Sequence, residues 1–173
     1  RLCIVGLGYV GLPLAIEFSK HYLTFGYDTN KLKIENLKKN KDINNEMSSV
    51  ILKKSKIKFT SKEKDLKNCN TYIVTVPTPI KKNNLPDLRI LKKATRLISK
   101  YLKPKDLVIY ESTVYPGVTE DVCIPILEEF SGLKLKNKKN YPNGSNYFYC
   151  GYSPERMNPG DKIRTLSKIP KLV

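Results

Sequence analysis

Short apolar runs alternate with amphipathic segments along most of the chain. Runs of strand character occupy residues 2–5, 22–27, 56–60, 71–76, 106–111 and 146–150. Segments with apolar residues at helical spacing occupy residues 12–18, 31–39, 87–101 and 119–130. Because strand and helix signals take turns, the pattern predicts an α/β fold of the Rossmann type, a doubly wound, mainly parallel sheet with helices on both faces.

Two boundaries in this pattern have a clear local cause. The continuous β-branched run at 71–76 suits a central strand, and the Pro-Thr-Pro sequence at 77–79 should stop it, although this sequence alone could also be simple turn punctuation. Asp87 is expected to cap the helix that follows. Residues 132–144, rich in Lys, Asn and Gly, are predicted to form a loop.

The turn between the first strand and the first helix has the pattern G-x-G-x-x-G. Gly6 would allow the tight turn, Gly8 would let a pyrophosphate approach the backbone, and Gly11 would let the helix pack close to the sheet. The free N–H groups and partial positive charge of the helix N-terminus would attract the same anion. The strand-turn-helix order therefore predicts a dinucleotide site.

A carboxylate stands where this kind of site needs one. Asp28 ends the second strand, about twenty residues beyond Gly8, where an acid binds the ribose hydroxyls of adenosine. A carboxylate there would repel a 2′-phosphate, so NAD is favoured over NADP. Two alternatives remain: Asp28 could cap a helix that begins near Lys31, and Lys31 or Lys33 could tolerate a phosphate.

The formal net charge of +16 raises the question of nucleic acid. Most of that charge is lysine, whereas base readout relies on arginine, and the lysines are spread over helices and loops without forming a stripe. We interpret the charge as a solvated surface and expect no nucleic-acid partner.

The cysteines and the apolar segments set further bounds. Four cysteines, Cys3, Cys69, Cys123 and Cys150, show no metal-ligand spacing, which favours buried thiols in a reducing, cytoplasmic compartment and no metal. No apolar stretch approaches the length of a membrane span, so no membrane partner is expected. The 173 residues suit one domain, and we expect residues 1–173 to be the N-terminal fragment of a longer, soluble protein.

Polar, small or rigid residues follow five of the predicted strands. They lie at residues 6–11, 28, 77–79, 112–113 and 151–156. Since ligands of open α/β sheets bind beyond the carboxyl ends of the strands, we expect these positions to form one dinucleotide site.

Four blocks of sequence, in order across nearly the whole chain, resemble the UDP-glucose/GDP-mannose dehydrogenase family. The blocks are residues 5–13 (VGLGYVGLP), 74–79 (VTVPTP), 110–120 (YESTVYPGVTE) and 151–161 (GYSPERMNPGD). The last block is most similar to the branch that acts on UDP-N-acetylhexosamines in the synthesis of bacterial surface polysaccharides.

This resemblance implies a reaction and a division of labour. A UDP-sugar is oxidised twice at its C6 hydroxymethyl group, with two NAD, to a carboxylate through a thioester on a cysteine. That cysteine lies in a Gly-Gly-x-Cys sequence on a later domain, which none of the four cysteines here matches. A central helix through which family members dimerise also lies beyond these residues. The fragment alone is expected to bind cofactor without turnover, and the full-length protein to be a homo-oligomer.

The resemblance also implies roles for single residues in binding NAD. The backbone N–H groups of Tyr9 and Val10 would face the pyrophosphate. Lys33 matches a basic position after the ribose acid, Thr78 lies against the adenosine side, and Thr113 lies near the nicotinamide and a catalytic water. Alternatively, Ser112 and Thr113 could cap the helix after Pro116.

The remaining implied roles concern catalysis and substrate. Glu155, with Thr113, matches a position that helps to activate water for thioester hydrolysis, and Arg156 and Met157 match substrate contacts, as Glu155 also does. The alternative for Glu155 is an ion pair with Arg156 or a surface lysine.

Other classes of protein share parts of these signals. A hydroxyacid or 6-phosphogluconate-type dehydrogenase has the glycine turn but would lack the Tyr-Ser-Pro-Glu-Arg block. A non-catalytic nucleotide- or nucleic-acid-binding module would use the basic surface instead. Flavin and S-adenosylmethionine sites reuse similar glycine turns.

Overall fold

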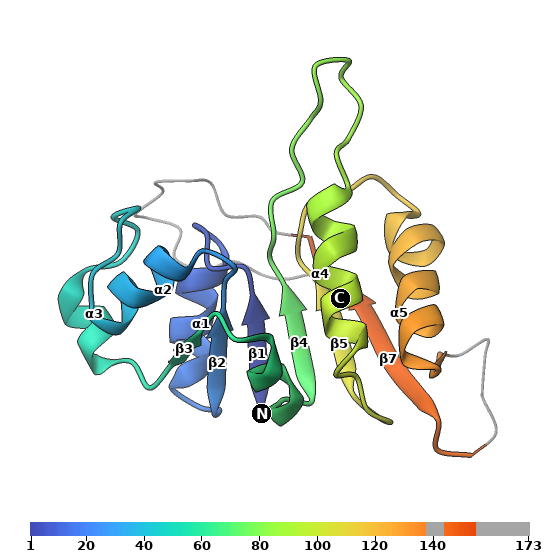
Figure 1. The fold of residues 1–173 in the computed structure, drawn as a ribbon, viewed down its shortest axis with the longest axis horizontal. Helices are drawn as coiled ribbons and strands as arrows, with labels where there is room; N and C mark the ends of the chain where they lie inside the picture. The colour runs from blue at the N-terminus through green and yellow to red at the C-terminus, as the bar shows by residue number, and fades with distance from the viewer. Residues whose placement is uncertain (138–143, 155–173) are drawn as a thin grey trace.

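The computed structural model describes residues 1–137 and 144–154, which contain a seven-stranded sheet (Figure 1). The strands are β1 (Leu2–Val5), β2 (Thr24–Tyr27), β3 (Lys58–Thr60), β4 (Thr71–Val74), β5 (Leu107–Tyr110), β6 (Lys134–Leu135) and β7 (Tyr147–Tyr152). Their order is β3-β2-β1-β4-β5-β7-β6, and all six pairings are parallel. The predicted Rossmann-type α/β fold is confirmed.

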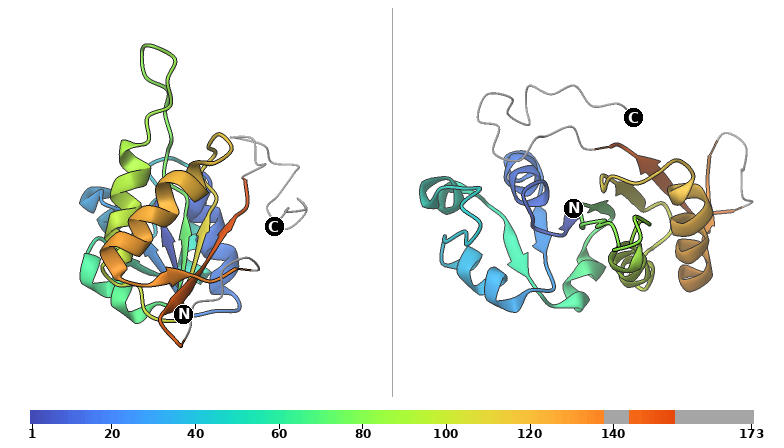
Figure 2. Two further views of the ribbon diagram at one scale, coloured as in Figure 1. Left: turned by 90° about the vertical axis from the view of Figure 1, so that its right-hand side faces the viewer. Right: turned by 90° about the horizontal axis from the view of Figure 1, so that it is seen from above.

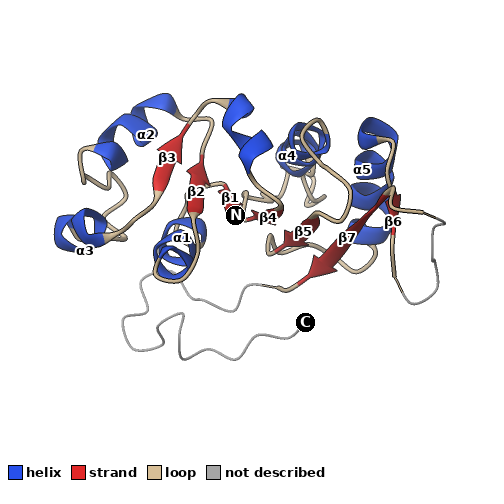
Figure 3. Ribbon diagram, turned by 90° about the horizontal axis from the view of Figure 1, so that it is seen from below, coloured by secondary structure: helices blue, strands red, loops and turns tan. Residues whose placement is uncertain are grey.

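Helices cover both faces of this sheet. They are α1 (Gly11–Ser19), α2 (Lys31–Lys38), α3 (Ser49–Lys54), the 3₁₀-helix η1 (Glu63–Asn68), α4 (Arg89–Ser99), the π-helical turn η2 (Thr119–Cys123) and α5 (Ile124–Ser131). One apolar cluster joins the sheet to α1, α2 and α3, and a second joins it to η1, α4 and α5. Figure 3 shows α1 on one side of the strands, with α4 and α5 on the other.

The strand order reverses between β1 and β4. From β1 the chain builds outward through β2 and β3, then returns to place β4 on the other side of β1. The turns that leave β1 and β4 therefore run in opposite directions and open a crevice at the carboxyl edge of the sheet, the usual ligand position in such folds.

β2, β3, β4 and β5 are shorter than the runs that predicted them, and for β4 and β2 the cause is local. β4 ends at Val74 instead of residue 76, because the Val74 carbonyl oxygen accepts both the Glu111 and the Ser112 N–H and closes the ladder with β5. β2 begins at Thr24 instead of residue 22, since Tyr22 and Leu23 are exposed at the end of the α1–β2 turn.

Other elements were missed or misjudged. The predicted loop at 132–144 contains β6, whose Lys134 and Leu135 pair with the start of β7. β7 runs two residues beyond the prediction, to Tyr152, because β5 pairs with it to the end. The short helices α3 and η1 were not predicted at all.

A hairpin rises from the carboxyl edge between β4 and α4, drawn in green at the top of Figure 1 and in the left view of Figure 2. Ile80 and Pro86 form an antiparallel bridge, and the Lys81 N–H donates to the Leu85 carbonyl oxygen at 2.8 Å. At its base, the Asp87 carboxylate accepts the Arg89 N–H at 3.0 Å. Asp87 therefore stands one residue before the N-cap of α4, Leu88, rather than at the cap itself.

No helix in the described ranges is both long enough and apolar enough to cross a bilayer.

Candidate functional site

A cavity of about 1210 Å³ lies at the carboxyl ends of β1, β2, β4 and β5. Most of the predicted cofactor residues line it, namely Gly6, Gly8, Tyr9, Val10, Asp28, Lys33, Thr78 and Thr113. Segments separated by a hundred residues in sequence thus meet in one site because the parallel strands bring their ends to one edge.

The three glycines of the turn have different surroundings. Gly6 has a φ of +101°, which L side chains rarely adopt, and a Cβ on it would lie 3.0 Å from the Thr75 carbonyl oxygen. A Cβ on Gly11 would overlap the Gly6 carbonyl oxygen and Thr75 Oγ1, so α1 packs tightly against the turn. A Cβ on Gly8 would meet nothing within 4 Å, which leaves open space beside the backbone for a ligand.

The N-terminus of α1 faces this space without a side-chain cap. Val10 is the N-cap residue and accepts the Leu14 N–H, and the first turn of the helix contains no acidic side chain. Helix N–H groups without side-chain acceptors, together with the helix dipole, favour an anion at this position.

The Asp28 carboxylate ties the glycine turn to the end of β2. Its Oδ2 accepts the Leu7 N–H and the Lys33 ammonium, both at 3.0 Å, and its Oδ1 accepts the Asn30 N–H at 2.9 Å. Lys33 Nζ also donates to the Leu7 carbonyl oxygen at 3.3 Å. Both side chains are largely buried, with exposed fractions of 13% for Asp28 and 18% for Lys33.

This geometry decides one alternative for Asp28. The cap of α2 is Asn30, whose side chain accepts the Lys33 N–H at 3.0 Å, so the interpretation of Asp28 as the helix cap is wrong. Among the described residues, Oδ1 accepts one hydrogen bond, from the Asn30 N–H, and keeps lone pairs for a further hydroxyl. The Lys33 ammonium is engaged by Asp28 on the inner side of the cavity.

Hydroxyl groups hold together the opposite side of the cavity. Thr75 Oγ1 donates to the Gly6 carbonyl oxygen at 2.7 Å, which fastens the end of β4 to the glycine turn. Thr78 Oγ1 donates to the Thr113 carbonyl oxygen at 2.6 Å, and Ser112 Oγ to that of Val76 at 2.7 Å. Thr78 and Thr113, predicted from separate blocks, are therefore brought together.

Sequence reasoning missed the part played by Thr75, which lay inside the predicted strand, although its position at the end of an apolar run was a signal. The capping role considered for Ser112 and Thr113 is wrong, because the helical segment begins at Thr119 after Val118 and has no side-chain cap.

One face of α4 forms a further wall that the sequence did not indicate. The residues of α4 and its C-cap that line the cavity are Ile90, Lys93, Ala94, Arg96, Leu97 and Lys100. Across from them lie the end of β2 and η1, from which Glu63 also lines the cavity.

Burial and nearby charges shift the pKa values of one tyrosine at the cavity and of two cysteines away from it. Burial, with the nearby carboxylates of Glu63 and Asp28, raises the pKa of Tyr27, which therefore stays a neutral phenol at the cavity. The described lining includes no cysteine, and burial raises the pKa of Cys123 and raises that of Cys150 to about 12. These two thiols lack the thiolate character of a nucleophile.

Glu155, Arg156 and Met157 lie outside the described residues, so their predicted roles stay predictions. The described part of the chain reaches their neighbourhood at Ser153, whose N–H donates to the Tyr110 carbonyl oxygen at 2.9 Å.

Comparison with known proteins agrees with this geometry. A UDP-N-acetyl-D-glucosamine 6-dehydrogenase of Pseudomonas aeruginosa is 49% identical over 99% of this chain and 39% of its own length. Protein CapL of Staphylococcus aureus is 46% identical over 100% of this chain and 39% of its own length. The structure of a UDP-D-ManNAc dehydrogenase from Pyrococcus horikoshii has a TM-score of 0.79 at 34% identity, covering 97% of this chain and 38% of that one.

The chain thus spans about two fifths of the length of these relatives. Residues 1–173 match the family described as UDP-glucose/GDP-mannose dehydrogenase family, NAD binding domain. The glycine turn, the position of Asp28 at the end of β2 and the match over the full sequence agree, and the chain belongs to the UDP-glucose/GDP-mannose dehydrogenase family, within its NAD-binding domain.

Proposed function

We propose that this chain supplies the NAD-binding part of a UDP-sugar 6-dehydrogenase that oxidises the C6 hydroxymethyl group of a UDP-N-acetylhexosamine to a carboxylate. The observation that carries the proposal is the cradle at the β1–α1 turn, in a chain 49% identical to a UDP-N-acetyl-D-glucosamine 6-dehydrogenase. The hydroxyacid and 6-phosphogluconate-type alternatives do not share this family match.

The residues at the β1–α1 turn and at the end of β2 suit the pyrophosphate and the adenosine ribose of NAD. Open space at Gly8 and the uncapped start of α1 suit the pyrophosphate, and the lone pairs left on Asp28 Oδ1 suit a ribose hydroxyl. When bound, NAD accepts a hydride from the alcohol carbon of the substrate. Under this proposal Tyr9 and Val10 hold the pyrophosphate through their N–H groups.

The adenosine ribose at Asp28 sets the direction of the dinucleotide. Its other half extends from the glycine turn toward the ends of β4 and β5, where Thr78 and Thr113 lie. We assign Thr113 to the nicotinamide end, Glu155 to the activation of water, and Arg156 and Met157 to the substrate. These assignments follow the resemblance of the sequence blocks.

The rest of the reaction belongs, in this proposal, to residues outside the printed sequence. They comprise a central helix, used for homo-oligomerisation, and a C-terminal domain with the nucleophilic cysteine and the UDP-sugar site. We further propose a cytoplasmic protein of bacterial polysaccharide synthesis, with no nucleic-acid or membrane partner.

Calorimetric titration of this chain with NAD and NADP tests the cofactor assignment. We expect saturable NAD binding with at least about tenfold preference over NADP, since Asp28 repels a 2′-phosphate. Equal affinity for both cofactors would contradict the assignment.

Substrate assignment is tested on the full-length protein with UDP-N-acetylglucosamine, UDP-N-acetylmannosamine, UDP-glucose and GDP-mannose. We expect two NADH to form for each UDP-N-acetylhexosamine consumed. A preference for UDP-glucose or GDP-mannose would exclude the proposed branch, and one NADH for each sugar would exclude oxidation to the carboxylate.

A further inference from the structure

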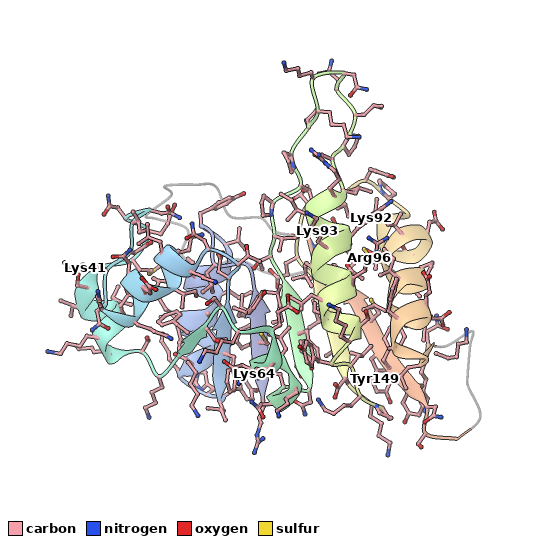
Figure 4. The ribbon with its side chains drawn as sticks, in the orientation of Figure 1. Lys41, Lys64, Lys92, Lys93, Arg96 and Tyr149 are labelled. Carbon is pink, nitrogen blue, oxygen red and sulfur yellow. The ribbon has the colours of Figure 1, made fainter. Side chains whose placement is uncertain are left out.

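The cavity extends beyond Asp28 onto α4, a region that the proposed function does not use. Ala94 and Leu97 are apolar; Lys93 directly precedes Ala94, and Lys100 lies three residues after Leu97. Figure 4 labels Lys93 and Arg96 on α4, close to the carboxyl ends of the strands. Arg96 also lines the cavity, and its guanidinium lies 5.6 Å from the centroid of the Phe130 ring.

The position of Asp28 indicates which part of a bound NAD lies against the cavity-facing side of α4. With the pyrophosphate at Gly8 and the adenosine ribose at Asp28, the attached base must extend away from β1, toward η1 and α4. Ala94 and Leu97 are largely buried, each with an exposed fraction of 8%, and contribute apolar atoms to the cavity lining against which a purine ring can pack.

One acidic and one basic side chain meet across this part of the cavity. Glu63 of η1 and Lys100, which caps the C-terminus of α4, both line the cavity, and Lys100 Nζ lies 3.8 Å from Glu63 Oε2. The two side chains are 52% and 60% exposed. An exposed pair at this distance is weak, so either group can turn to a ligand at little cost.

The hydrogen-bonding groups of Glu63 and Lys100 are complementary to one edge of adenine. Adenine presents an amino group at C6, which donates, beside N1, which accepts. A glutamate only accepts and a lysine only donates. Hypoxanthine reverses both positions, with a carbonyl oxygen at C6 and a proton on N1.

We propose that Glu63 and Lys100 recognise the base of the dinucleotide, with Glu63 accepting from the adenine amino group and Lys100 donating to N1. The inference rests on the proposed NAD site. It adds base selectivity to that site and places it on η1 and α4, outside the glycine turn.

Competition between NAD and nicotinamide hypoxanthine dinucleotide tests this proposal. We expect the wild-type chain to bind NAD about tenfold more tightly, the scale of one or two hydrogen bonds to charged groups in a partly exposed site. Glu63→Gln keeps the shape and presents both a donor and an acceptor, so the ratio should fall to about two or less. Lys100→Met should weaken NAD binding and reduce the ratio as well.

Glu17→Gln is the matched control. Glu17 forms an exposed pair with Lys20 at the other end of α1, remote from the cavity, so this change should leave the ratio at the wild-type value. Thermal unfolding of each variant, compared with wild type, verifies that it is folded.

The outcomes separate the two proposals. If the wild-type chain does not bind NAD, the proposed function fails and the base-recognition proposal fails with it. If it binds NAD but binds both dinucleotides equally, or if Glu63→Gln and Lys100→Met keep the wild-type ratio, base recognition by this pair is overturned while NAD binding stands. A collapsed ratio in both variants, with Glu17→Gln unchanged, supports the proposal.

Discussion

The two halves of the cavity differ in whether backbone or side-chain groups form them. The half formed by β1, α1 and β2 is mainly backbone, a glycine turn and the first N–H groups of a helix, with one side-chain carboxylate that binds the turn. The half formed by β4, α4 and β5 consists of side chains: three hydroxyls that fasten loops to one another, and one face of a helix. The backbone half should therefore tolerate little substitution, and the side-chain half should respond in smaller steps.

The largest effect is expected from Gly11→Ala. Its Cβ would overlap the Gly6 carbonyl oxygen, and backbone cannot move aside cheaply, so we expect about 3 kcal/mol of destabilisation or more. Thermal unfolding should show a decrease of roughly 6 °C or more in Tm.

Gly8→Ala is the comparison for this variant. Its Cβ meets nothing in the protein, so stability should change by less than about 1 kcal/mol while NAD affinity falls more than about tenfold. A Gly8→Ala variant that binds NAD as wild type does would show that the dinucleotide does not approach this turn.

Asp28→Asn should give the next largest effect. The change removes the charge that partners the largely buried Lys33 ammonium and weakens the bond to the Leu7 N–H, at a cost of about 1–3 kcal/mol. NAD affinity should fall about tenfold and the preference over NADP should narrow, as measured by calorimetry.

Asp42→Asn is the matched control for Asp28→Asn. The Asp42 carboxylate accepts hydrogen bonds from three backbone N–H groups, where Asp28 accepts from two and from the Lys33 ammonium, but Asp42 does not line the cavity. It should leave the NAD-to-NADP ratio unchanged, and an equal shift in both variants would assign the effect to general destabilisation.

A smaller effect is expected from Thr75→Val in the side-chain half. The Gly6 carbonyl oxygen loses a donor at 2.7 Å, which should cost about 1 kcal/mol and weaken NAD binding a few-fold by loosening the turn. Thr78→Val, which removes a more exposed hydroxyl, should cost less in urea unfolding. The reverse order would contradict the account of how the two halves are joined.

The smallest effect concerns acid at the hairpin base. Hydrogen bonds from Arg89 hold the pKa of Asp87 at about 2, below its ordinary value. Because this pKa is lowered in the folded chain, the contribution of the pair is complete above about pH 4 and is lost as the pH falls through 2. An NMR titration of the Asp87 carboxyl group should show that low midpoint; a midpoint near 4 would contradict the pairing.

The strands and helices that carry most of the core could be predicted because each buries a run of apolar residues. β1, for example, is buried at all four positions. The elements that were missed each contribute little to the core: α3 buries Leu52 and η1 buries Leu66. A single buried leucine produces no periodicity, so such elements depend on neighbours that the sequence does not identify.

The site residues also divide into those that the sequence could predict and those that depend on contacts between distant segments. The glycine turn and Asp28 could be predicted from spacing, since the three glycines and the acid follow one another at the intervals of a β-turn-α-β unit. Thr75 finds its acceptor, Gly6, 69 residues away, and only the pairing of β4 with β1 brings the two together. The cavity face of α4 was likewise hidden, because its apolar residues read only as core.

A crystal structure of this chain with NAD tests the central claim most directly. We predict the pyrophosphate within hydrogen-bonding distance of the N–H groups of Tyr9 and Val10, over Gly8, with the adenosine ribose on Asp28 and the nicotinamide beyond Thr75 toward Thr113. A dinucleotide bound elsewhere, or bound with its nicotinamide at Asp28, would contradict it.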